Sequence, residues 1–171
     1  MRLFAITPAF STADQIDEQD VQTLAASGFK TVVGNRPDAE GGVPMARIGA
    51  ACARSGLKFF SQPVEFSAIG LGDADEFGRI LQQSDKPVLA YCRIGRRSAA
   101  LWALACAPLA GVQAVLEASA RAGVNLEELR ALLERSAARV DPPYASSTDP
   151  AARERFIERW IKDIVGAAQR S

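Results

Sequence analysis

Cys92 is the side chain in this sequence best placed for nucleophilic chemistry. It follows the apolar run of residues 87–91, and a short segment containing Gly95 separates it from a predicted helix. Successive backbone N–H groups in a tight turn, together with the N-terminal end of a helix, stabilise an anion. This pattern predicts that the Cys92 sulfur is held as a thiolate, the form of cysteine that acts as a nucleophile.

Three arginines, Arg93, Arg96 and Arg97, lie within five residues of Cys92. Their mutual repulsion predicts an anion at this loop, and a guanidinium can bind an oxyanion through two hydrogen bonds. We expect Arg97 to orient the substrate. Arg93 and Arg96 are expected either to draw anions to the mouth of the site or to be solvated charges of the turn.

The backbone of residues 93–98 is expected to cradle the bound anion, which places Ile94, Gly95 and Ser98 in the same anion-binding loop. The Ser98 hydroxyl is expected either to donate a hydrogen bond to the sulfur or to cap the following helix. Two second-tier candidates lie elsewhere. Arg36 either binds the far end of the substrate or caps carbonyls of its own turn, and Glu65 is either a general acid or a solvated loop charge.

The chain contains no histidine. This excludes, from the chain's own residues, a Ser-His-Asp triad, a Cys-His pair and a histidine-ligated metal. The three cysteines, Cys52, Cys92 and Cys106, have no metal-type spacing and do not suggest a disulfide framework. We therefore expect a reducing compartment, no metal or organic cofactor, and a buried apolar role for Cys52 and Cys106.

The composition argues against two classes of binding partner, nucleic acids and membranes. Lys and Arg number 20 and Asp and Glu number 20, so the formal net charge is zero and no basic field favours nucleic acid. No apolar stretch reaches the roughly 18–20 residues that span a bilayer, and the N-terminal apolar run is too short for a signal peptide. We expect a cytoplasmic protein that binds neither nucleic acid nor membrane.

The chain alternates predicted strands and helices. Strands are expected at residues 29–33, 57–60 and 87–91, and helices at 17–27, 44–55, from 73, 98–106, 112–122 and after 125. This order predicts an α/β fold with a central, mostly parallel sheet flanked by helices. Ligands of such sheets bind at the carboxyl ends of the strands. Cys92 and the pair Asn35 and Arg36 each follow a strand, so we expect them at one edge.

We predict one catalytic domain over residues 1–140, followed by a linker and an amphipathic helix within 141–171. Apolar residues recur along one face of that helix, among them Phe156, Trp160, Ile164 and Val165. This stripe predicts packing against the core or against a second copy of the chain in a homodimer.

Three separated motifs, at residues 28–38, 87–98 and 101–104, resemble the DUF442 family. This family is the phosphatase-like domain of beta-lactamase hydrolase-like proteins and is also described as a sulfur transferase family. The resemblance covers roughly residues 3–135, and it implies a dual-specificity-phosphatase-like fold with Cys92 as the nucleophile.

The loop departs from the phosphatase pattern. Protein tyrosine phosphatases carry Cys-x5-Arg after a histidine, whereas here Tyr91 precedes Cys92, Arg97 comes one position early and Ser98 takes the arginine's place. The shorter loop resembles that of single-domain rhodaneses. Sulfur transfer also needs no general acid, because its leaving group is already a weak base.

We therefore predict a rhodanese-type sulfurtransferase that moves sulfane sulfur through a Cys92 persulfide. The donor would be a small anion such as thiosulfate or glutathione persulfide, and the acceptor a thiol or cyanide. The alternative is a protein-tyrosine or dual-specificity-like phosphatase with a phosphoester substrate and a Cys92 phosphocysteine intermediate. A third reading is a noncatalytic oxyanion-binding or redox-sensing module.

Overall fold

The computed structural model describes residues 1–145 and 149–165, with side chains up to residue 162. Its centre is a five-stranded sheet in the order β1-β2-β5-β3-β4. The strands are β1 (Leu3–Thr7), β2 (Phe10–Ala13), β3 (Thr31–Gly34), β4 (Lys58–Ser61) and β5 (Val88–Tyr91). Only β1 runs antiparallel to its neighbour, and every other pair is parallel. The predicted mostly parallel α/β fold is confirmed.

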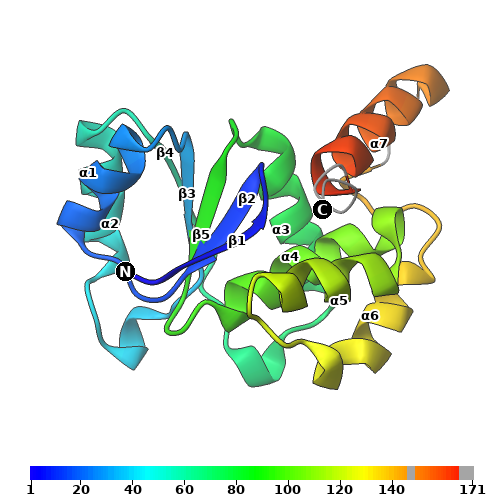
Figure 1. Ribbon diagram of the computed structural model, residues 1–171, viewed down its shortest axis with the longest axis horizontal. Helices are drawn as coiled ribbons and strands as arrows, with labels where there is room; N and C mark the ends of the chain where they lie inside the picture. The colour runs from blue at the N-terminus through cyan, green and yellow to red at the C-terminus, as the bar shows by residue number, and fades with distance from the viewer. Residues whose placement is uncertain (146–148, 166–171) are drawn as a thin grey trace.

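Helices lie on both sides of this sheet (Figure 1). One side carries α1 (Glu18–Ala26) and α2 (Met45–Arg54). The other carries α3 (Leu71–Gln83), α4 (Arg96–Ala110), α5 (Val112–Arg121), α6 (Arg130–Ala137) and α7 (Pro150–Val165). Three short 3-10 turns, η1 (Asp38–Glu40), η2 (Phe66–Ala68) and η3 (Glu127–Leu129), lie in connections. Two apolar clusters, one on each side of the sheet, form the core.

Strand β5 is central and buried along its whole length, as its unbroken apolar sequence predicts. Helix α4 follows it and is buried from Arg97 to Ala107, because its small apolar residues allow it to pack closely beneath the sheet among α3, α5 and α6. It begins two residues earlier and ends four residues later than the predicted helix of residues 98–106. The nucleophile loop is therefore held between two of the most deeply buried elements.

Two helix starts differ from the sequence expectation. Helix α3 begins at Leu71, not after Asp73, because the Asp73 carboxylate lies inside the first turn and accepts a hydrogen bond from the Gly70 N–H at 2.9 Å. Asn125 accepts from the Glu127 N–H at 2.9 Å, as a capping residue does, but the turn it starts is η3, and α6 follows only at Arg130.

The C-terminal segment packs against α4. The Tyr144 hydroxyl donates to the carbonyl of Ala105, and the Tyr144 ring stacks on Trp160 of α7 with the centroids 5.8 Å apart. Both aromatic side chains are buried. The predicted stripe also included Ile164 and Val165, whose side chains lie outside the described part of the chain, as do residues 146–148 and 166–171.

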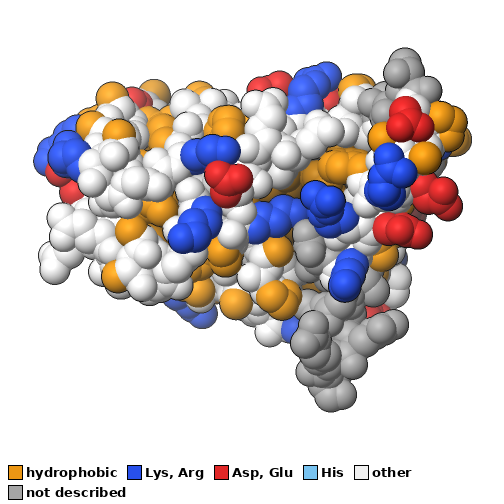
Figure 2. Space-filling model, turned by 90° about the horizontal axis from the view of Figure 1, so that it is seen from above, with side chains coloured by type: hydrophobic (Ala, Val, Ile, Leu, Met, Phe, Trp, Pro, Cys, Tyr) orange, Lys and Arg blue, Asp and Glu red, His pale blue; other side chains and the backbone are white. Residues whose placement is uncertain are grey.

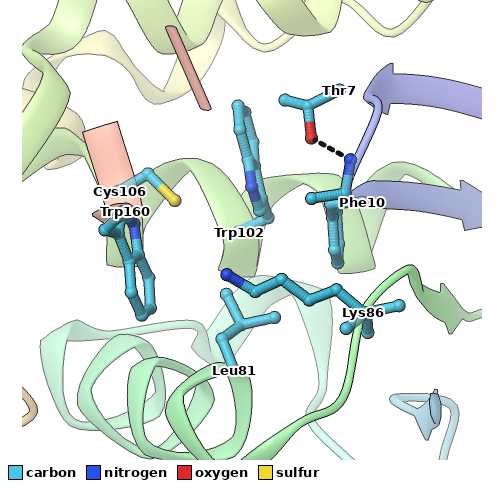
Figure 3. A pocket seen from close by; sticks show the side chains of 9 residues that line it. Thr7, Phe10, Leu81, Lys86, Trp102, Cys106 and Trp160 are labelled. Atoms are coloured by element: carbon cyan, nitrogen blue, oxygen red, sulfur yellow. Dashed lines mark hydrogen bonds between the residues drawn. The ribbon is translucent and has the colours of Figure 1, made fainter. Parts of the chain in front are cut away.

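An apolar pocket lies beneath α7, where Trp160 and Cys106 approach Lys86 and Trp102 (Figure 3). Lys86 precedes β5 and Val88 is its first residue, whereas Cys92 follows the end of the same strand. This pocket is therefore separated from the nucleophile by the length of the strand and belongs to the packing of the C-terminal segment.

Charged side chains of both signs are interspersed with apolar ones on the face shown in Figure 2. This distribution agrees with a formal net charge of zero. Within the described residues, no helix combines the length and the apolar character needed to cross a bilayer.

Candidate active site

Three strand ends converge on Cys92. The Cys92 N–H donates to the carbonyl of Ala13 at the end of β2, at 3.2 Å. Asn35 follows β3, and its N–H donates to the carbonyl of Tyr91 at 2.9 Å. Cys92 and Asn35 thus lie side by side at the carboxyl edge of the sheet, where the strand order predicted them.

The loop after Cys92 turns its backbone toward the sulfur. The Gly95 N–H donates to Cys92 Sγ at 3.1 Å, and α4 begins at the next residue. Gly95 has φ +85°, and a Cβ at this position would lie 2.9 Å from the Phe4 ring, so this position requires glycine. The buried sulfur faces a backbone N–H and the N-terminal end of α4, an arrangement that attracts a bound anion.

Arg97 is buried, and other groups hold its guanidinium in place. Nη1 donates to the carbonyl of Asn35 at 3.1 Å, and Nη2 donates to Glu40 Oε1 at 2.7 Å. Its buried Nε–H has no acceptor among the described residues. This N–H is therefore a donor that Arg97 retains for a bound anion.

Asn35 connects the elements around the nucleophile. Its Nδ2 donates to the carbonyl of Gln62 at 3.1 Å, and its own carbonyl accepts from Val64 N–H at 3.2 Å as well as from Arg97. The Ser98 hydroxyl donates to Asn35 Oδ1 at 2.8 Å. Neither of the two roles predicted for Ser98 is what the structure shows, because its proton goes to Asn35 rather than to the sulfur and the hydroxyl caps no helix.

Arg36 and Arg97 share one carboxylate, that of Glu40. Arg36 Nε lies 3.8 Å from Glu40 Oε2, while Arg97 binds Oε1. Arg36 also donates to Gln15 Oε1 at 2.8 Å and to the carbonyl of Glu40 at 2.7 Å. Arg36 therefore caps a carbonyl of its own turn, which is one of the two roles predicted for it. Glu40 was not among the predicted site residues, although two neighbouring arginines at one sheet edge are a signal that a carboxylate lies between them.

The remaining loop arginines differ from each other. Arg96 pairs with Glu128 at 2.5 Å and lies over the Phe66 ring at 5.2 Å. Arg93 is exposed and forms no ion pair or hydrogen bond with the described residues. The inference that the three arginines require an external anion is wrong for Arg96, which pairs with Glu128; Arg97 shares the carboxylate of Glu40 with Arg36, so that pair of arginines keeps one positive charge in excess.

Glu65 is exposed on the loop that follows β4, and this loop packs against the nucleophile loop. On one side of Glu65, Val64 binds Asn35; on the other, Phe66 lies under Arg96. The Glu65 carboxylate forms no ion pair or hydrogen bond with the described residues. The loop therefore brings a carboxylate without such a partner to the same side of the molecule as Cys92.

Cys52 and Cys106 are buried in the apolar clusters on opposite sides of the sheet. Burial raises the pKa of the Cys52 thiol to about 11 and that of the Cys106 thiol to about 12. Both are protonated at neutral pH, which agrees with the packing role expected of them.

Residues 2–110 match the sequence profile of the phosphatase-like domain of beta-lactamase hydrolase-like proteins. A beta-lactamase hydrolase-like protein of Agrobacterium fabrum is 28% identical over 106 residues, which cover 61% of this chain and 25% of that protein. The chain thus spans about a quarter of the length of the curated relatives it matches.

Two solved structures show the same fold. A protein of Neisseria meningitidis, provisionally described as a phosphatase, is 31% identical, with a TM-score of 0.71 over 80% of this chain and 99% of that one. TpbA of P. aeruginosa, in complex with pTyr, is 19% identical, with a TM-score of 0.56 over 91% of this chain and 90% of that one. The match of the family profile to more than half of the chain, with the shared fold, shows that this chain belongs to the phosphatase-like domain family of beta-lactamase hydrolase-like proteins.

Proposed function

We propose that this chain is a cysteine-dependent phosphatase that hydrolyses phosphate monoesters through a Cys92 phosphocysteine. The observation that carries this proposal is the Cys92 sulfur at the start of buried helix α4, with the Gly95 N–H directed at it. The thiolate attacks phosphorus, so an S–P bond forms as the ester P–O bond breaks. Water then attacks the phosphocysteine, which releases phosphate and restores the thiolate.

The comparisons support phosphate rather than sulfane sulfur as the first chemistry to test. The family is named for its likeness to phosphatases, and the Neisseria relative is provisionally described as one. The TpbA structure holds phosphotyrosine in the same fold. Sulfur transfer, which the loop length and its lack of need for a general acid favoured, therefore becomes the second candidate.

Each residue around Cys92 receives a role in this proposal. The backbone of residues 93–98 and the free Nε–H of Arg97 bind the phosphoryl oxygens, where negative charge accumulates in the transition state. Glu65 donates a proton to the leaving oxygen, a contribution that is typically about a hundredfold or more in rate. Asn35 and Ser98 act as positioning residues, because they fix the loop without touching the reacting atoms.

One observation favours sulfur transfer as the second candidate. Only four residues separate Cys92 from Arg97, and two of the three guanidinium nitrogens of Arg97 already bind protein groups. In this reaction the thiolate attacks the outer sulfur of a donor such as thiosulfate. An S–S bond forms on Cys92 as sulfite leaves, and an acceptor thiol then removes the sulfur.

The test compares wild type, Cys92→Ser and Cys52→Ala with a fluorogenic aryl phosphate and, separately, with thiosulfate followed by intact-mass measurement. We expect phosphate release by wild type and Cys52→Ala and none by Cys92→Ser. A Cys92-dependent gain of one sulfur without any phosphate release would overturn the phosphatase in favour of the sulfurtransferase. Phosphate release that persists in Cys92→Ser would overturn both.

A further inference from the structure

We propose that the substrate carries one anionic group on an uncharged, largely apolar body, and that this body lies in a groove beside the nucleophile loop. This inference rests on the proposed function in one respect: the anionic group of the substrate binds at Cys92. It names the class of substrate that this loop and its surroundings favour, and it separates that class from polyanions such as inositol polyphosphates.

The first step is the charge around the nucleophile. Arg36 and Arg97 share the carboxylate of Glu40, and Arg96 pairs with Glu128. Of the four arginines on this rim, Arg93 is the one without a carboxylate partner among the described residues. These four arginines and their two carboxylate partners carry two positive charges in excess, and the Glu65 carboxylate lies on the same side of the molecule, so the site suits one phosphoryl group and not several.

The second step is the groove itself. It is an open groove of about 470 Å³ that runs from the nucleophile loop to the segment between α5 and η3. Its apolar part is formed by Phe4, Ile94 and Val124. Ile94 lies two residues after Cys92 and is 62% exposed. An apolar side chain exposed beside a nucleophile gains free energy when a ligand removes it from water.

The third step is the charge of the groove walls. Arg2 lies over the Phe4 ring at 4.9 Å, and Arg96 is neutralised by Glu128. On the same wall, Glu127 accepts two hydrogen bonds from Arg130, at 2.9 and 3.0 Å. The lining of the groove thus contains two cations and two carboxylates, so it offers no net positive charge to a second or third phosphate on the substrate.

The test measures binding to the Cys92→Ser protein by calorimetry, so that turnover does not enter. Phenyl phosphate is compared with inorganic phosphate, and benzenethiosulfonate with thiosulfate, because each pair shares a head and differs in the apolar body. Inositol hexakisphosphate is the polyanion probe. If the loop binds phosphate, we expect phenyl phosphate to bind at least tenfold more tightly than inorganic phosphate. If it binds thiosulfate, we expect the same advantage for benzenethiosulfonate. Inositol hexakisphosphate should bind no more tightly than phosphate.

Three further variants in the Cys92→Ser background locate the effect. Ile94→Ser is expected to reduce the aryl preference to less than threefold. Val140→Ser is the matched control, because Val140 is 85% exposed and does not line the groove, and it should leave the preference unchanged. Glu128→Gln releases Arg96 and is expected to tighten binding of inositol hexakisphosphate at low salt.

The outcomes separate this inference from the proposed function. An aryl preference confined to the thiosulfonate pair would support the groove and overturn the phosphatase. Binding of phosphate with no gain from the phenyl ring would support the phosphatase and overturn the groove. Tighter binding of the polyanion than of phenyl phosphate, or no binding of any probe, would overturn the substrate class.

Discussion

At the scale of single residues, Asn35 is the group on which the site geometry most depends. It is fully buried and bonds the ends of β3 and β5, the loop after β4, and the first turn of α4. A buried amide with all of its groups paired fixes its neighbours, and removal of one partner leaves an unsatisfied polar atom. Asn35 therefore links segments that are distant in the sequence and fixes the position of the nucleophile loop relative to them.

Ser98→Ala tests this network. The substitution removes the donor to Asn35 Oδ1, so we expect a loss of about 1–3 kcal/mol in the free energy of unfolding. Ser119→Ala is the control, because the buried Ser119 hydroxyl has no partner among the described residues and its removal should be neutral or stabilising. Urea unfolding measures both. Equal losses in the two variants would contradict the role of Asn35.

Glu40→Gln tests whether the shared carboxylate positions Arg97. The amide keeps the shape but removes the charge that buried Arg97 shares with half-buried Arg36, so kcat should fall about tenfold or more as the Arg97 guanidinium loses its fixed orientation. Glu128→Gln, which loosens the more exposed Arg96, should lower kcat less than twofold. Steady-state kinetics with an aryl phosphate provide kcat and KM separately. A change in KM alone would argue against a positioning role for Glu40.

The site residues that could be predicted are neighbours in the chain, whereas those that could not be predicted act through residues distant in the sequence. Cys92 and Gly95 could be predicted because strand end, turn and helix start are consecutive in the chain. Asn35 was expected at this edge, but its bond to Arg97, 62 residues away, was not predicted, and Glu40, which binds Arg97 from 57 residues away, was missed. Such partners depend on which strands are neighbours in the sheet, and the chain order alone does not determine that.

At the scale of elements, local signals predicted the helices well. The Asp17–Asp20 capping box begins α1, with hydrogen bonds of 2.8 and 3.0 Å in both directions. Strands β1 and β2 were not predicted, because they are short and form by pairing with each other and, in the case of β2, with β5, whose residue Val88 pairs with Phe10. Short strands of this kind carry little periodicity of their own.

Gly78→Ala tests the packing of the C-terminal segment on α3. A Cβ at Gly78 would overlap the Tyr144 ring, so we expect the segment to shift and the protein to lose about 1–3 kcal/mol of stability. Gly72→Ala, in the same helix, meets nothing within 4 Å and should be neutral or stabilising by up to about 1 kcal/mol. Thermal unfolding and the fluorescence of Trp160 report the two effects. A Gly78→Ala protein with unchanged stability and fluorescence would contradict the close packing of Tyr144 on Gly78.

At the scale of the whole molecule, the alternation of strands and helices was enough to predict the class of fold and the edge that holds the site. Two apolar clusters, one on each side of the sheet, account for its stability. They also enclose groups that ionise at high pH. Burial raises the pKa of Cys52 to about 11 and of Cys106 to about 12, and it raises the pKa of Tyr91 and Tyr144 above the ordinary tyrosine value.

These buried acids predict alkaline instability. Their folded pKa values exceed the unfolded ones, so the stabilisation is complete below about pH 8.5 and is lost as the pH rises toward 11 and 12. Each thiol should contribute a slope of about 1.4 kcal/mol per pH unit in that window. Urea unfolding between pH 8 and 11 should show a shallower decline for Cys106→Ala than for wild type. An equal decline of the unfolding free energy in both proteins would contradict a raised pKa for Cys106.

The measurement that tests the central claim most directly is the site of the covalent intermediate. Wild-type protein is mixed with an aryl phosphate, quenched in acid within one turnover, digested and mapped by mass spectrometry. We expect a phosphoryl group on Cys92, absent from the Cys92→Ser protein, with Cys52 and Cys106 unmodified. Turnover of the ester with no phosphoryl group on Cys92, or with the group on either buried cysteine, would contradict Cys92 as the nucleophile.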